Sequence, residues 1–115
     1  MISPILTVRF FATASGKEPV RDWLKTLAAQ ERRMIGEEIK TVQFGWPLGM
    51  PLVRKMTTDL WEVRIHLVDR TARVLFTVEG DCMVLLHGFI KKSQTTPKQE
   101  LALAKQRLQQ IRSQL

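Results

Sequence analysis

The chain has 115 residues, with 18 lysines and arginines against 11 aspartates and glutamates, and a formal net charge of +7. This length suits one domain and excludes two independent cores, and a hydrophobic fraction of 44% is ordinary for a globular domain. No apolar run is long enough to cross a bilayer, and the basic charge favours a polyanion as partner.

The amino-terminal segment and the cysteine content favour a reducing, cytoplasmic location. Arg9 interrupts the apolar run of residues 1–11 and no small-residue cleavage site follows, so we expect no signal peptide. The single Cys82 cannot form an internal disulfide. We expect no metal site, because neither histidine stands at a ligand spacing, and no nucleotide cofactor, because glycine-rich phosphate loops are missing.

The amino-terminal half predicts one strand and two helices. Apolar and polar residues alternate over residues 6–11, which is typical of a strand. Ser15 and Glu18 form a capping-box pattern before Pro19. An apolar stripe then predicts a first helix through Val20, Trp23, Leu24 and Leu27, and a second helix is predicted over residues 31–43.

The carboxy-terminal half predicts four strands and a helix. Glycines and prolines make residues 45–51 a loop, and strand patterns cover residues 52–56, 60–68, 72–79 and 82–90. Thr96 and Gln99 form a second capping-box pattern around Pro97. The apolar stripe of the last helix contains Leu101, Ala104, Leu108, Ile111 and Leu115.

The order β-α-α-β-β-β-β-α predicts a single α+β domain over residues 1–115. We expect an antiparallel sheet of about four to five strands, with two amino-terminal helices and one carboxy-terminal helix packed on one face. Trp46 and Trp61 are interpreted as core or loop anchors rather than as platforms for base stacking.

Positive charge concentrates near the carboxy terminus. Residues 86–115 carry six basic side chains and one acidic one. Along the final helix, cations repeat every seven residues at Lys98, Lys105 and Arg112. Phosphate binding requires such a cluster, and a solvated helix face that keeps the protein soluble is the alternative.

A second group of cations is predicted on the sheet. Glu62, Arg64 and His66 share one face of their strand because side chains alternate, and Arg73 follows on the next strand. Further cations stand on the preceding strand and after the last one, at Arg54, Lys55, Lys91 and Lys92. The alternative interpretation is a set of solvated ion pairs in which Arg64 and Arg73 meet Glu62 and Glu79.

This group suits RNA cleavage without a metal. The ribose 2′-hydroxyl attacks the adjacent phosphate, arginines stabilise the phosphorane through their fork of donors, and a lysine becomes a base if neighbouring cations lower its pKa. DNA lacks the 2′-hydroxyl, so this chemistry selects RNA.

Three segments carry a resemblance to a known family: Leu60–Arg64 (LWEVR), Arg73–Phe76 (RVLF) and Leu86–Pro97 (LHGFIKKSQTTP), with Glu100 and Ala104 beyond. They resemble the phage-derived HigB-like toxins of the RelE/ParE superfamily, which belong to type II toxin–antitoxin systems. The resemblance implies a RelE-like fold and a ribosome-dependent mRNA endonuclease that cuts the message in the A site. It also implies a helix-turn-helix antitoxin of the HigA type, and a complex that reaches operator DNA through that antitoxin.

The resemblance also assigns roles to residues. It makes Arg64, Arg73, Lys91 and Lys92 catalytic, with one of the two lysines as acid or base. The candidates for RNA binding are Arg54, Lys55, His66, His87, Phe89 and Lys98. Many RelE-type toxins have a tyrosine near the site, and this chain has none, so the acid and the base stay unassigned.

Two other functions stay open at the level of sequence. One is a ParE-like inhibitor of gyrase without catalysis, and the other is a non-catalytic basic module that binds RNA. The run His87–Lys92 and the paired Arg64 and Arg73 favour the nuclease. For His87 alone, a hydrogen-bonded residue inside a strand is the simpler interpretation.

Overall fold

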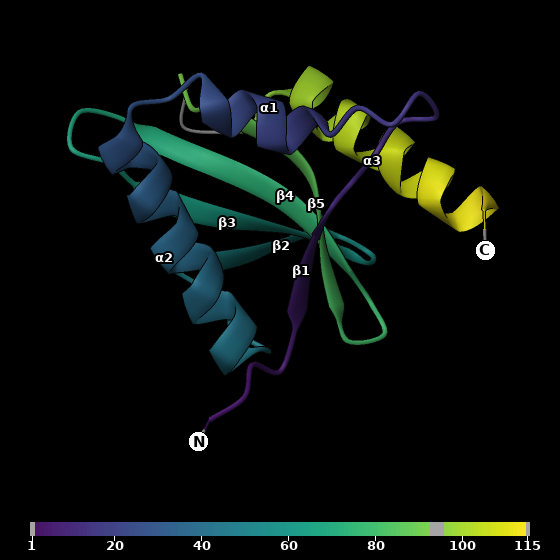
Figure 1. Cartoon of the computed structure of the whole chain (residues 1–115), viewed down its shortest axis with the longest axis horizontal. Helices are drawn as coiled ribbons and strands as arrows, with labels where there is room; N and C mark the ends of the chain where they lie inside the picture. Colours follow the sequence, from purple (N-terminus) through teal and green to yellow (C-terminus); the bar gives the residue numbers. More distant parts are fainter. Residues whose placement is uncertain (1, 93–95, 115) are drawn as a thin grey trace.

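The computed structural model describes residues 2–92 and 96–114 of the chain. The described residues form five strands and three helices in the predicted order (Figure 1). The elements are β1 (Thr7–Phe10), α1 (Pro19–Lys25), α2 (Ala29–Gly45), β2 (Val53–Thr57), β3 (Leu60–His66), β4 (Thr71–Glu79), β5 (Cys82–Ile90) and α3 (Lys98–Ser113). The α+β class is confirmed. Among the described residues, no helix has the length and apolar character that a membrane crossing requires.

The five strands form one sheet in the order β1-β5-β4-β3-β2. Strands β2 to β5 are antiparallel neighbours, as predicted. Strand β1 instead runs parallel to β5, with Thr7 opposite Cys82. The sheet is therefore mixed, and α1 and α2 carry the chain from one edge strand, β1, to the other, β2.

The helices cover both faces of the sheet, so the prediction of one covered face is wrong. One apolar core joins α1 and α2 to inward side chains of β3 and β4 such as Val63, Val74 and Phe76. The other joins Ala104 and Leu108 of α3 to the opposite face, with Leu60, Leu75 and Leu86. The reason is visible in β4, which is buried at every residue from 72 to 77 and needs cover on both sides. We call the side under α3 the α3 face.

Neither predicted capping box forms. The Ser15 hydroxyl lies 3.1 Å from that of Thr13, and Glu18 is the residue before α1, without a capping bond from its side chain. Pro97, rather than Thr96, directly precedes α3, which frees the Thr96 hydroxyl for another partner. Leu115, the last residue of the predicted stripe, lies outside the described residues.

Two close contacts fix the α1 and α2 side of the sheet. Trp46, at the end of α2, packs edge-on against Trp61 and Phe76, with ring centroids 5.0 and 5.6 Å away, which confirms the tryptophans as anchors. At Gly88 of β5, a Cβ atom would lie 2.4 Å from the ring of Trp23. Glycine therefore lets α1 approach the strand that carries His87 and Phe89.

Candidate functional site

The register of the central strands brings the predicted arginines together. Arg64 on β3 lies opposite Arg73 on β4, and Arg73 lies opposite Phe89 on β5. Strand alternation places Glu62 on the same α3 face. Two like charges directly opposite one another destabilise a sheet, so this pair requires a counter-charge.

Glu62 supplies that counter-charge to Arg73. The Nη1 atom of Arg73 donates to Oε1 of Glu62 at 2.5 Å, and the two side chains are 1% and 0% exposed. The pair is therefore buried, not solvated. Among the described residues, Nε and Nη2 of Arg73 are buried and have no hydrogen-bond partner. These two atoms form the edge of a guanidinium that binds carboxylates and phosphates through two parallel bonds.

Lys91 lies next to this pair. Its backbone N–H donates to the carbonyl of Thr71 at 2.8 Å, which holds the residue beside the start of β4. Burial lowers the pKa of Lys91, the positive charges of Arg73 and Arg64 lower it further, and Glu62 opposes them. We call Arg64, Arg73 and Lys91, with Glu62, the basic cluster: it has three cations and one carboxylate.

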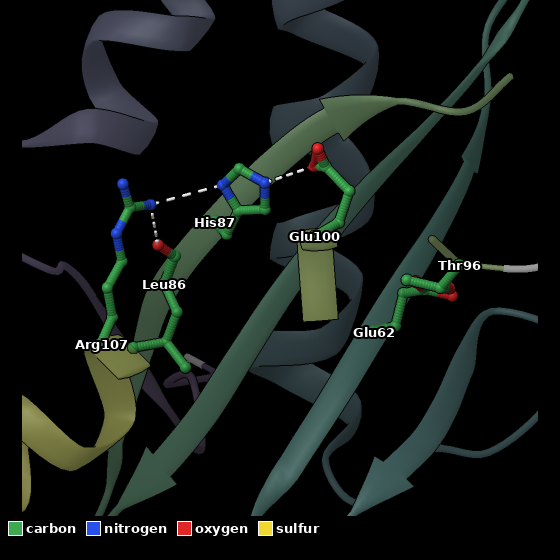
Figure 2. Close-up of polar contacts among 6 residues, drawn as sticks. All are labelled: Glu62, Leu86, His87, Thr96, Glu100 and Arg107. Atoms are coloured by element: carbon green, nitrogen blue, oxygen red, sulfur yellow. Dashed lines mark hydrogen bonds and ion pairs between the residues drawn. The ribbon is translucent and has the colours of Figure 1, made fainter. Parts of the chain in front are cut away.

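The second oxygen of Glu62 binds the segment before α3. The Thr96 hydroxyl donates to Oε2 of Glu62 at 2.6 Å, and Figure 2 shows the two side chains side by side. Glu62 and Thr96 were not among the predicted site residues. The shared face with Arg64 was a signal for Glu62, whereas the capping-box pattern around Thr96 indicated another role.

The remaining predicted residues surround the basic cluster or lie apart from it. Arg54 is exposed opposite Glu62 on the α3 face, and His66 is exposed at the end of β3. Lys92 is exposed directly after Lys91, and Lys98 is exposed at the start of α3. Lys55 pairs with Trp61 and belongs to the other face of the sheet. Residues 93–95 of the quoted motif lie outside the described residues.

The comparisons with known proteins place the chain in a family. Residues 22–109 match the sequence profile of the phage-derived Gp49-like proteins (DUF891). The chain belongs to this family. The Gp49-like family is phage-derived and toxin-like, which is consistent with a toxin–antitoxin system. No curated protein matches the chain.

The matched range of this Gp49-like protein includes a polar network that fastens α3 to β5. His87 Nε2 lies 2.5 Å from Oε2 of Glu100, and Nδ1 lies 3.3 Å from Nη1 of Arg107 (Figure 2). Arg107 also donates to the carbonyl of Leu86 at 2.8 Å. The ladder between β4 and β5 shifts register at Leu86, so Arg107 bonds to the strand at its irregular point.

This network shows which contacts His87 and Phe89 make. Both ring nitrogens of His87 have partners, which confirms the interpretation as a hydrogen-bonded strand residue. Phe89 is 9% exposed and stacks on His87 with centroids 5.7 Å apart. Glu100 and Arg107 were missed as partners, because only the fold brings α3 over β5.

Proposed function

We propose that this protein is the toxin of a type II toxin–antitoxin system and cleaves mRNA in the ribosomal A site. The main support is the basic cluster, in which Arg73 is paired with Glu62 and Arg64 lies opposite Arg73 in the sheet. Lys91 is close enough for both arginines to lower its pKa, and Nε and Nη2 of Arg73 have no partner among the described residues. Membership of a toxin-like family supports the class.

The cluster suits attack by a ribose 2′-hydroxyl. In this proposal, Lys91 removes the hydroxyl proton, because its lowered pKa increases the fraction of neutral amine. The 2′-oxygen bonds to phosphorus, Arg73 and Arg64 stabilise the charged phosphorane, and the bond to the 5′-oxygen breaks. Lys92 gives the 5′-oxygen its proton, since the chain has no tyrosine for this step. The products are a cyclic phosphate and a free 5′-hydroxyl.

The proposal includes dependence on the ribosome. Arg73 is 1% exposed, so a phosphate reaches its Nε–Nη2 edge only if the residues packed around Arg73 move. For a flexible RNA in solution, this movement and the ordering of the RNA both cost free energy. A message held in the A site is already ordered, so the second cost is absent. We expect cleavage of free RNA to be slow or absent. The antitoxin, of the HigA type, and the operator complex belong to the same proposal.

One observation favours a second candidate. A buried Arg73–Glu62 pair also fits a purely structural role, as in a ParE-like inhibitor of gyrase without catalysis. That protein would inhibit DNA supercoiling by purified gyrase and leave mRNA intact.

The experiment is cleavage of a defined mRNA by the purified protein, with 5′ ends mapped, in a translating extract and in the same buffer without ribosomes. We expect cuts in codon register only with ribosomes. Intact mRNA in both tubes, from folded protein that inhibits gyrase, would overturn the nuclease in favour of the second candidate. Intact mRNA without gyrase inhibition would leave RNA binding as the function.

A further inference from the structure

Glu62 is a buried carboxylate that joins three elements. It stands on β3, accepts from Arg73 of β4 through Oε1, and accepts from Thr96 before α3 through Oε2. Because both oxygens are bonded and the side chain is 0% exposed, the carboxylate has one orientation. Arg73 receives its own orientation from this fixed partner.

A second arginine pair in the chain shows what a carboxylate does when it only neutralises a guanidinium. Glu31 binds Arg70 through Nε and Nη2, with both N···O distances at 2.9 Å. That contact uses the edge best suited to carboxylates and phosphates. Glu62 instead takes Nη1 of Arg73 and leaves that edge without a partner among the described residues.

The charges of the basic cluster also indicate that Glu62 does more than neutralise Arg73. Glu62 is the one carboxylate among the groups that act on Lys91, beside Arg64 and Arg73. The charge of Glu62 offsets one of the three cations, so the cluster keeps a net positive charge that attracts an anion. Both oxygens of Glu62 are already bonded, so Glu62 does not compete for the Nε–Nη2 edge of Arg73, which has no partner among the described residues.

We propose that Glu62 is a positioning residue that directs the Nε–Nη2 edge of Arg73 toward the scissile phosphate and is itself held by Thr96. This inference rests on the proposed function for the identity of the phosphate. The arrangement of Glu62, Arg73 and Thr96 can be tested without any cleavage reaction.

The test is a titration of the full-length protein with inorganic phosphate, followed by the NMR resonance of the Arg73 Nε–H group. The variants are Glu62→Gln and Thr96→Val, and Glu31→Gln is the matched control because it removes the carboxylate that pairs with Arg70, away from the basic cluster. A thermal unfolding transition establishes first that each variant is folded.

Positioning and simple electrostatics predict opposite results for Glu62→Gln. Removing a negative charge beside an anion site would tighten phosphate binding, whereas loss of orientation weakens it. We expect the wild-type resonance to move on titration, with binding about tenfold weaker in Glu62→Gln and about fivefold weaker in Thr96→Val. Glu31→Gln should bind phosphate as the wild type does.

Equal or tighter binding by folded Glu62→Gln would overturn the inference, as would a wild-type Arg73 resonance that does not respond to phosphate. If Glu62→Gln does not fold, Thr96→Val decides, because it keeps both charges; wild-type affinity in that variant would overturn the inference. Failure of mRNA cleavage, with these titrations as expected, would instead overturn the proposed function alone.

Discussion

Arg73 makes one side-chain hydrogen bond among the described residues, although a guanidinium has five N–H groups. A cation this buried is costly unless it is paired, and Glu62 pairs it from one side only. Truncating Arg73 would leave the buried charge of Glu62 without its ionic partner, with the Thr96 hydroxyl still bonded to Oε2, and would destabilise the fold. Arg64 and Lys91 are therefore the better positions for testing chemistry, since both are only half-buried.

The pH dependence of cleavage tests the role of Lys91. Its pKa lies below the ordinary 10.5 because of burial and then of Arg73 and Arg64, so the neutral base forms at lower pH than in a free lysine. We expect the rate to rise with pH. Arg64→Gln removes one like charge, raises the pKa of Lys91 and should move the pH–rate curve to higher pH.

The measurement is the initial rate of cleavage on programmed ribosomes over the pH range in which the ribosomes stay intact. A curve for Arg64→Gln that moves to lower pH, or that keeps its wild-type midpoint, would contradict the role of Lys91 as base.

At the scale of residues, sequence pattern placed some members of the site and missed others. Alternation along β3 predicted that Glu62 and Arg64 share a face, and this is confirmed. The burial of Arg73 could not be predicted, because it depends on segments far along the chain. The role of Thr96 was hidden for the same reason: its local pattern is typical of a helix cap, and its partner lies 34 residues away.

At the scale of elements, α3 is held to the sheet by apolar packing and by Arg107. This side chain donates to the Leu86 carbonyl, contacts His87, and lies 5.6 Å from the ring centroid of Phe11. Burial lowers the pKa of Arg107 and Glu100 opposes this, which indicates a cation held in a partly desolvated position. The attachment of α3 also keeps Thr96 in reach of Glu62.

Arg107→Met preserves the length of the side chain and removes its donors. We expect the free energy of unfolding to fall by about 1–3 kcal/mol, because the Leu86 carbonyl loses its donor. Urea unfolding at neutral pH measures this. The control is Lys105→Met on the exposed side of α3, which should stay within about 0.5 kcal/mol of the wild type. An equal urea midpoint for Arg107→Met would contradict the attachment.

Element types were predictable because their periods are local. The patterns of β2 to β5 gave the strands to within two residues, and the stripe of α3 gave its buried residues Ala104 and Leu108. The parallel pairing of β1 with β5 was not predictable, since Thr7 and Cys82 are distant in sequence and no turn connects them. The covering of both faces was missed because a buried strand does not reveal which helix covers which side.

At the scale of the whole molecule, the fold determines where the charges that make up the net +7 lie relative to one another. The central strands bring Arg64, Arg73 and Lys91 close to one another, with Arg73 paired to Glu62. Other cations, such as Lys40, lie on α2, on the other side of the sheet. Net charge supports approach to RNA in general. In the proposed function, cleavage depends on the basic cluster and not on total charge.

The most direct measurement compares the rate of codon-register mRNA cleavage by Arg64→Gln with that by Lys40→Gln on the same ribosomes. Each variant removes one positive charge, so nonspecific attraction to RNA falls equally. We expect a rate about 10²–10³ lower for Arg64→Gln, because a phosphorane stabiliser is lost, and a rate near that of the wild type for Lys40→Gln. Equal rates for the two folded variants would contradict the proposed function.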